Sequence, residues 1–174
     1  KSSDDEVKNS FGDFDNVRDL FEKTDYETYV PITLFWNEKM EIPNIWGNGF
    51  GEWGVIWVDM SKYMDFEKDH PQTVLSTSIV IFDKKSSVTG KTANETIDIE
   101  ELKKETVRQV RKVLKMPEPD YTVLSPGVYR DNDKWSTKDS AYILTKHHQK
   151  FPFTSSKFSN LHNVGTHNDR NTIG

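Results

Sequence analysis

One segment of the chain, residues 98–115, has the pattern of a long amphipathic helix. Asp98 and Glu101 have the spacing of an N-terminal capping box. Acidic residues fill the first turn and basic residues the last, as the helix dipole favours, and prolines follow. The apolar residues expected to form its buried stripe are Ile99, Leu102, Val110 and Val113, joined on the flank by Val107 and Leu114. The sequence therefore predicts a helix that packs one face against the rest of the chain.

The other apolar segments alternate with the period of two that is typical of strands. In residues 29–36 one face carries Val30, Ile32, Leu34 and Trp36, and Pro31 indicates an edge strand or the start of a strand. The Gly- and aromatic-rich segment 46–53 suits a hairpin or a bulge. Further strands are expected at residues 53–60 (central in the sheet), 73–82, 121–129 and 141–146.

These elements predict an α+β fold, a mainly antiparallel sheet with the helix of residues 98–115 packed on it. Asp15 is placed to cap a short N-terminal helix through Glu22. Residues 1–14 read as a flexible acidic lead-in, residues 15–159 as the α+β domain and residues 160–174 as a separate closing segment. With 34% hydrophobic and 12% aromatic residues, the core should have few members and many rings.

Charge and composition exclude several classes of protein. The net charge of -5 argues against a general nucleic-acid binder. The absence of cysteine removes disulfides and thiolate sites, which fits a reducing compartment and, without a signal peptide, a cytoplasmic location. No apolar run is long enough to span a membrane. The spacing of the five histidines matches no familiar ligand pattern, so no metal site is predicted.

The tryptophans near the middle of the chain support two interpretations. On a strand, Trp53 and Trp57 would lie on one face, with Asp59 continuing the row. They are either members of a ring-rich core, which is the favoured interpretation, or an aromatic wall facing a substrate. Asp59 is expected to lie at the strand end in contact with water.

The closing residues 160–174 differ from the rest of the chain in charge. They belong to a locally basic stretch, although the chain as a whole is acidic, and they include Gly165, Thr166 and His167. Because glycine lets the backbone approach a ligand closely, this turn suits a phosphate or pyrophosphate. An ordinary polar terminus remains the alternative.

Residues 161–167, Leu-His-Asn-Val-Gly-Thr-His, resemble the last flavin-contact motif of the flavin-dependent amine oxidase and phytoene desaturase superfamily. The order of elements over residues 26–174 is similar to the substrate domain of that superfamily. Thr166 stands where many relatives carry an acidic residue. The Ser-x-Glu-x-Ala helix and the dinucleotide-binding half of such proteins are not in this chain, so we expect a part of a larger protein.

The resemblance implies a fragment of an FAD-dependent oxidoreductase that acts on an amine or another small apolar substrate. Gly165, Thr166 and His167 would lie near the cofactor, and Trp53 and Trp57 on the substrate side. The resemblance assigns no catalytic residue, because the flavin performs the redox chemistry. The dinucleotide-binding half of the same protein would be the partner, and the fragment alone would neither hold FAD nor turn over.

Two other functions are open. One is a non-enzymatic α+β interaction or structural domain that uses the Trp- and Gly-rich loop of residues 46–53, above all Trp46 and Phe50, as its contact surface. The other is a small-ligand barrel or cup lined by the same rings.

Overall fold

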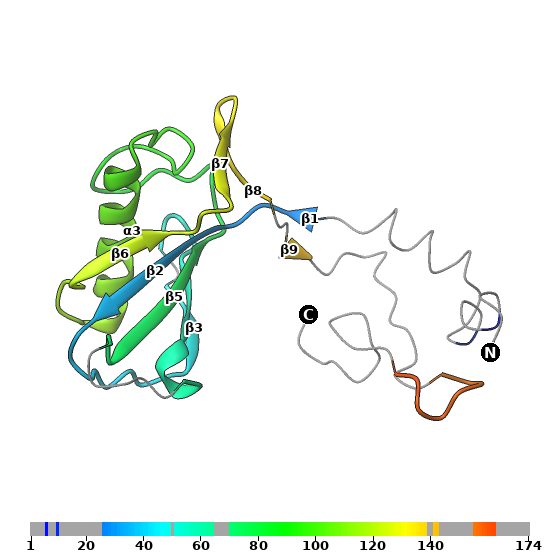
Figure 1. The fold of residues 1–174 in the computed structure, drawn as a ribbon. Coiled ribbons are helices and arrows are strands. Elements are labelled where there is room, and N and C mark those ends of the chain that lie inside the picture. The colour runs from blue at the N-terminus through cyan, green and yellow to red at the C-terminus, as the bar shows by residue number, and fades with distance from the viewer. Residues whose placement is uncertain are drawn as a thin grey trace. The chain divides into compact units, whose positions relative to one another are not determined.

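The computed structural model describes residues 6, 10, 26–49, 51–64, 70–138, 141–142 and 155–162. The chain divides into two compact units, one of residues 28–140 and one of residues 1–27 together with 141–174 (Figure 1). The short helix predicted at residues 15–22 lies outside the described residues. Each unit is described by itself.

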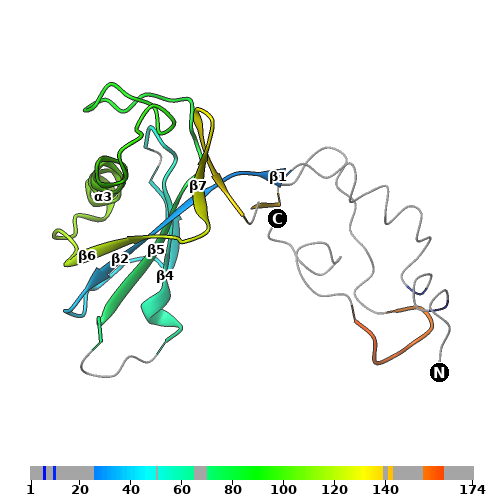
Figure 2. The same cartoon turned by 45° about the horizontal axis from the view of Figure 1, so that its top comes forward.

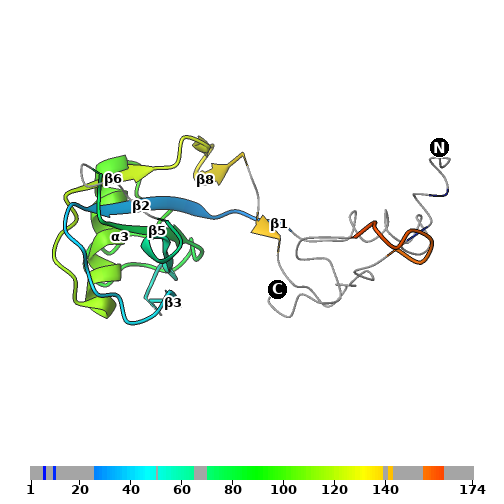
Figure 3. The same ribbon diagram turned by 60° about the horizontal axis from the view of Figure 1, so that its bottom comes forward.

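An antiparallel sheet of five strands is the centre of the unit of residues 28–140. The strands are β2 (Val30–Trp36), β3 (Trp46–Asn48), β4 (Ile56–Asp59), β5 (Thr73–Ile79) and β6 (Tyr121–Leu124). Their spatial order is β3-β4-β5-β2-β6, and every neighbouring pair runs antiparallel. Strands β6, β2, β5 and β3 are labelled in Figure 3. The predicted α+β class and the antiparallel sheet are confirmed.

Strand β2 shows how the alternation of the sequence becomes two faces. Val30, Ile32, Leu34 and Trp36 are buried, whereas the residues between them are half-buried. Pro31 is the second residue of the strand, and its carbonyl accepts a hydrogen bond from the Ser125 N–H at 3.1 Å. Proline at the start of a strand removes one donor from the ladder and leaves the rest of it intact.

Helix α3 (Ile99–Leu114) covers one face of this sheet (Figure 2). The Asp98 side chain accepts a hydrogen bond from the Glu101 N–H at 2.7 Å, which confirms the predicted N-cap. The helix ends at Lys115, which adopts a left-handed conformation with φ of 57°. The predicted helix is confirmed at both ends.

The buried stripe of α3 differs from the expected one. Leu102, Val107 and Val110 are buried as predicted, but Ile99 and Val113 are exposed. The buried side of α3 instead includes three polar residues, Glu105, Thr106 and Gln109. The prediction was wrong here because it counted only apolar residues toward the buried face, and hydrogen-bonded polar groups can also be buried.

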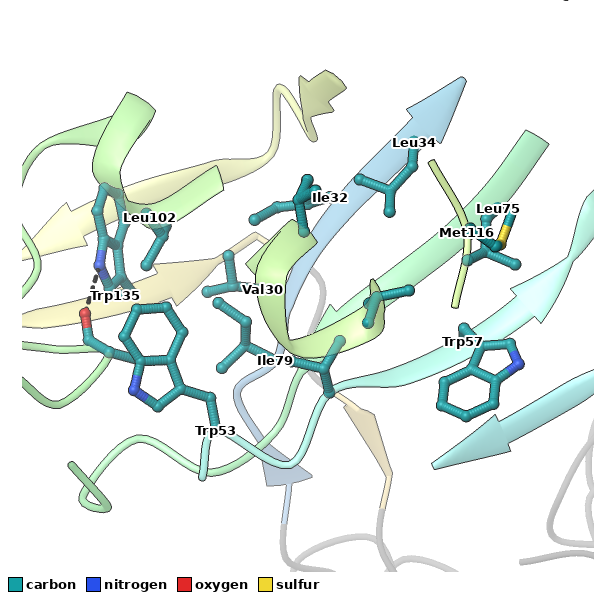
Figure 4. Packing of buried hydrophobic residues seen from close by; sticks show 14 of the residues in the cluster. Val30, Ile32, Leu34, Trp53, Trp57, Leu75, Ile79, Leu102, Met116 and Trp135 are labelled. Atoms are coloured by element: carbon teal, nitrogen blue, oxygen red, sulfur yellow. Dashed lines mark hydrogen bonds between the residues drawn. The ribbon is translucent and has the colours of Figure 1, made fainter. Parts of the chain in front are cut away.

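The hydrophobic core lies between α3 and the sheet and is rich in rings (Figure 4). It holds the side chains of Trp36, Trp53, Trp57 and Trp135. Each large aromatic side chain buries about 150–250 Å². Four such rings compensate for the low hydrophobic fraction of the chain.

A two-stranded hairpin follows the sheet. Its strands are β7 (Val128–Asp131) and β8 (Lys134–Thr137). The single strand predicted at residues 121–129 is therefore two strands, β6 and β7, divided by a turn in which the Val128 N–H donates to the Ser125 carbonyl at 3.0 Å. The Trp135 ring anchors the hairpin, because its Nε1–H donates to the carbonyls of Ala93 and Thr96, each at 3.0 Å.

In the other unit, β1 (Tyr26–Glu27) pairs antiparallel with β9 (Ala141–Tyr142). Strand β9 is the described part of the strand predicted at residues 141–146. The Ser156 N–H donates to the Ser10 carbonyl at 2.7 Å, and Ser10 is fully buried.

Candidate functional site

The two tryptophans assigned to the substrate side lie in the core. Trp53 is 0% exposed and Trp57 is 4% exposed, and both lie on the side of the sheet that α3 covers. The expected strand of residues 53–60 begins only at Ile56, because Gly54 adopts a positive φ of 58° and turns the chain. Neither ring is open to a solvent-borne ligand in this structure, which agrees with the favoured interpretation of core packing. A substrate contact by these rings stays a prediction.

Hydrogen bonds from α3 fix the position of Trp53. The Trp53 backbone N–H donates to Gln109 Oε1 at 3.1 Å, and Gln109 Nε2 donates to Glu105 Oε1 at 2.9 Å. Gly51 makes this approach possible, since a Cβ at that position would lie 2.7 Å from Gln109 Oε1. Helix α3 therefore holds the glycine-rich turn before β4 through polar contacts.

Glu105 is the centre of this polar cluster, although it is only 3% exposed. Its carboxylate accepts hydrogen bonds from Ser86 Oγ at 2.7 Å and from Arg108 Nη2 and Nε at 2.6 Å and 2.7 Å. Burial opposes the charged form, but the hydrogen bonds from Arg108, Gln109 and Ser86 outweigh it and lower the pKa of Glu105. Arg108 also lies 3.5 Å from Glu52, which extends the cluster to the turn.

The cluster therefore ties together three segments that are distant in sequence: α3, the turn at residues 51–54 and the loop at Ser86. All of its buried charge is paired and hydrogen-bonded, as burial requires. Such an arrangement stabilises the fold, and it leaves no free group for acid–base chemistry.

Trp57 is held between β3 and the core. A Cβ on Gly47 would lie 2.4 Å from Trp57 Cζ2, so only glycine lets β3 pair this closely. The indole Nε1–H of Trp57 is buried, and no described residue accepts a hydrogen bond from it.

Asp59 differs from its expected position in water. It is almost fully buried and accepts a hydrogen bond from the Ser61 N–H at 3.0 Å, as the N-cap of a short 3-10 helix, Met60–Lys62. That expectation was wrong because a carboxylate at a strand end can cap the following turn.

On the opposite face of the sheet, several apolar side chains reach the surface. The strand registers align Trp46 with Val58, Val58 with Ser76, Ser76 with Thr33, and Thr33 with Val123. This row crosses all five strands, and its members are exposed or half-buried. Trp46 is the most open of them, at 67%.

A second row on this face ends in an aromatic pair. Phe35 and Tyr121 stack with 4.5 Å between ring centroids and 9° between ring planes. Tyr121 and Val123 are 45% and 44% exposed. We call the exposed and half-buried side chains of these two rows the open face, and they form the candidate functional site: Thr33, Phe35, Trp46, Val58, Ser76, Tyr121 and Val123. The alternation of β2 already placed Phe35 on this side, but pairing it with Tyr121 requires the register.

Gly165, Thr166 and His167, the expected cofactor contacts, lie outside the described residues, as does Phe50. Within the described part of the chain, no group of three or more His, Asp or Glu residues could hold a metal ion. No helix among the same residues has the length and apolar character needed to cross a membrane.

Comparisons with known protein families, with characterised proteins and with solved structures find no match to this chain.

Proposed function

We propose that this chain supplies the substrate-binding side of an FAD-dependent oxidoreductase related to the amine oxidases and phytoene desaturases. The proposal rests on the resemblance of residues 161–167 to the flavin-contact motif and on the order of elements in the α+β unit. The cofactor would be bound by a dinucleotide-binding half of the same protein together with Gly165, Thr166 and His167.

The open face gives this proposal its strongest structural support. It presents apolar and aromatic side chains on a rigid sheet, and an apolar or amine substrate would bind to such a surface by burying it. The stacked rings of Phe35 and Tyr121 would form the wall that the sequence suggested for Trp53 and Trp57. An oxidoreductase of this kind needs from the protein mainly the position of the substrate against the flavin.

The experiment begins with the complete reading frame that encodes the chain. A Gly-x-Gly-x-x-Gly motif before Lys1, and a purified protein that is yellow and has flavin absorbance, would support the proposal. A complete protein with neither property would refute it.

Variants of the complete protein then test the open face. Phe35→Ala and Tyr121→Ala should raise KM for an amine substrate while the flavin content stays unchanged, because these residues would contact substrate and not cofactor. Tyr129→Ala is the matched control, since Tyr129 is a similarly exposed ring on the β7–β8 hairpin. Equal changes of KM in all three variants would show that the open face does not bind the substrate.

The exposure of Trp46 favours a second function, that of a non-enzymatic interaction domain. An indole 67% open to solvent is typical of a contact residue, and Ile45 beside it is also exposed. In that case Trp46→Ala should abolish association of the chain with itself or a partner and leave the unfolding transition unchanged. Unaltered association after this substitution would exclude the loop as the contact surface.

A further inference from the structure

At the outer edge of β6 lie backbone groups that have no partner among the described residues. Strand β6 pairs with β2 on one side and is the last strand of the sheet on the other. Because the Ser125 N–H donates to the Pro31 carbonyl, the antiparallel alternation directs the backbone groups of Val123 and Tyr121 to β2. Those of Thr122 and Leu124 are directed outward, and no hydrogen bond from the described residues reaches them.

This edge lacks the usual protection. Natural edge strands carry charged residues or proline, which discourage the addition of another strand. Strand β6 reads Tyr-Thr-Val-Leu and has neither. The opposite edge strand, β3, is only three residues long and contains Gly47, so it offers less to pair with.

A groove runs beside the edge. It has a volume of about 480 Å³ and lies between α3 and the chain that leads into β6. From the helix it is lined by Glu100, Lys103, Lys104 and Val107, and from the strand side by Glu118, Pro119, Asp120, Tyr121 and Thr122. Side chains of a strand added next to β6 would alternate between this groove and the apolar open face at Tyr121 and Val123.

Lys104 favours an acidic residue in the part of the added strand that faces it, although the groove also holds the carboxylates of Glu100, Glu118 and Asp120. Lys103 is paired with Glu100 at 2.8 Å, and Glu118 is paired with Arg111. The Asp120 carboxylate accepts a hydrogen bond from the Asn37 N–H at 2.7 Å. Lys104 is exposed, and no carboxylate of the described residues pairs with it.

We propose that the outer edge of β6 binds an extended segment of another polypeptide as a sixth strand, with an acidic side chain of that segment placed against Lys104. Main-chain hydrogen bonds to Thr122 and Leu124 give the affinity, and the groove beside α3 gives the selectivity. This inference does not depend on the flavin function.

The test uses the full chain and a short, fluorescein-labelled peptide of alternating Thr and Val with one central Glu, capped at both ends. Fluorescence anisotropy measures its affinity. The same peptide with N-methyl groups on alternate residues keeps every side chain but loses the donors of one edge, so its affinity should fall about tenfold or more. A peptide with Lys in place of Glu should bind roughly threefold more weakly, as expected for loss of an exposed ion pair.

Two variants locate the site. Lys104→Glu should reverse the preference, so that the Lys peptide binds more tightly than the Glu peptide. Lys112→Glu is the matched control, because Lys112 is exposed on the same helix but does not line the groove, and it should leave the preference unchanged. Thr122→Pro removes one outward N–H and should reduce binding of the Glu peptide about tenfold.

The charge reversal at Lys104 keeps the proposal testable even if the proline variant fails to fold. No binding of the Glu peptide up to about 1 mM would overturn the proposal. Equal affinity of the N-methylated peptide would also overturn it, and so would an unchanged preference in Lys104→Glu. A chain that dimerises in sedimentation experiments and loses the dimer in Thr122→Pro would assign the edge to self-association, against the proposal.

Discussion

The side-chain carbonyl of Gln109 accepts a hydrogen bond from the backbone N–H of Trp53 at 3.1 Å. This contact joins the middle of α3 to the turn that leads into β4, two segments that lie 56 residues apart in the sequence. Because both groups are buried, neither can exchange its partner for water. The same contact positions the Trp53 ring in the core.

Gln109→Leu removes this acceptor and should lower the free energy of unfolding by about 1–3 kcal/mol, since the buried Trp53 N–H and the Glu105 carboxylate each lose a partner. Urea unfolding followed by tryptophan fluorescence measures the change. Lys112→Leu, an exposed substitution on the same helix, is the control and should have little effect. Similar stability of the two variants would show that the cluster contributes nothing.

The lowered pKa of Glu105 predicts a dependence of stability on pH. Its pKa in the folded state lies below the ordinary value of 4.5, so the stabilisation is complete above that value and is lost as the pH falls through the folded pKa. In Glu105→Gln the loss of stability at acidic pH should be shallower than in the wild type, although the variant is less stable at neutral pH. Urea unfolding at a series of pH values from neutral to acid measures both effects. Parallel pH profiles for the two proteins would contradict the assignment.

The two buried indoles Trp57 and Trp135 should respond differently to replacement by phenylalanine. Trp135 donates to two carbonyls, those of Ala93 and Thr96, whereas the Trp57 N–H finds no acceptor in the described part of the chain. Trp135→Phe should therefore cost about 1 kcal/mol or more beyond the cost of Trp57→Phe. Chemical denaturation of both variants measures the difference. The reverse order would mean that an unseen acceptor satisfies Trp57.

Gly47→Ala should destabilise the chain by about 1–3 kcal/mol, because the added Cβ would lie 2.4 Å from the buried Trp57 ring. Gly127→Ala is the matched control, since a Cβ there would meet its nearest neighbour at 3.7 Å, an ordinary contact. Thermal unfolding of the two variants measures the effect. A stable Gly47→Ala variant would show that β3 can move away from the core.

Local sequence patterns predicted the elements whose causes are local. The cap at Asp98 and the prolines after the helix mark both ends of α3, and the alternation in β2 separates its buried face from its half-buried one. These features depend on spacing within one segment, which the sequence displays directly. For the open face, the sequence shows only which side chains alternate within one strand. Which of them lie side by side on neighbouring strands depends on the register of strand pairing.

Such local patterns did not predict which polar groups are buried. Asp59 was expected to contact water, and Glu105 was not counted among the buried residues. Both carboxylates are buried because hydrogen-bond donors reach them, from Ser61 to Asp59 and from Arg108 to Glu105. The strand β8 also escaped prediction, since its stability comes from pairing with β7 and from the contacts of Trp135.

The sequence by itself determined that the described part of this chain folds as an antiparallel sheet with a capped helix at Ile99–Leu114 and a ring-rich core, since periodicity and capping are properties of neighbouring residues. Only the tertiary structure decided that Trp53 and Trp57 face the helix and that Tyr121 and Trp46 face outward. It also decided that, among the described residues, no strand pairs with the outer edge of β6. The physical reason is that the face on which a side chain lies, and whether a polar group finds a partner, depend on strand register and on contacts between segments far apart in the chain.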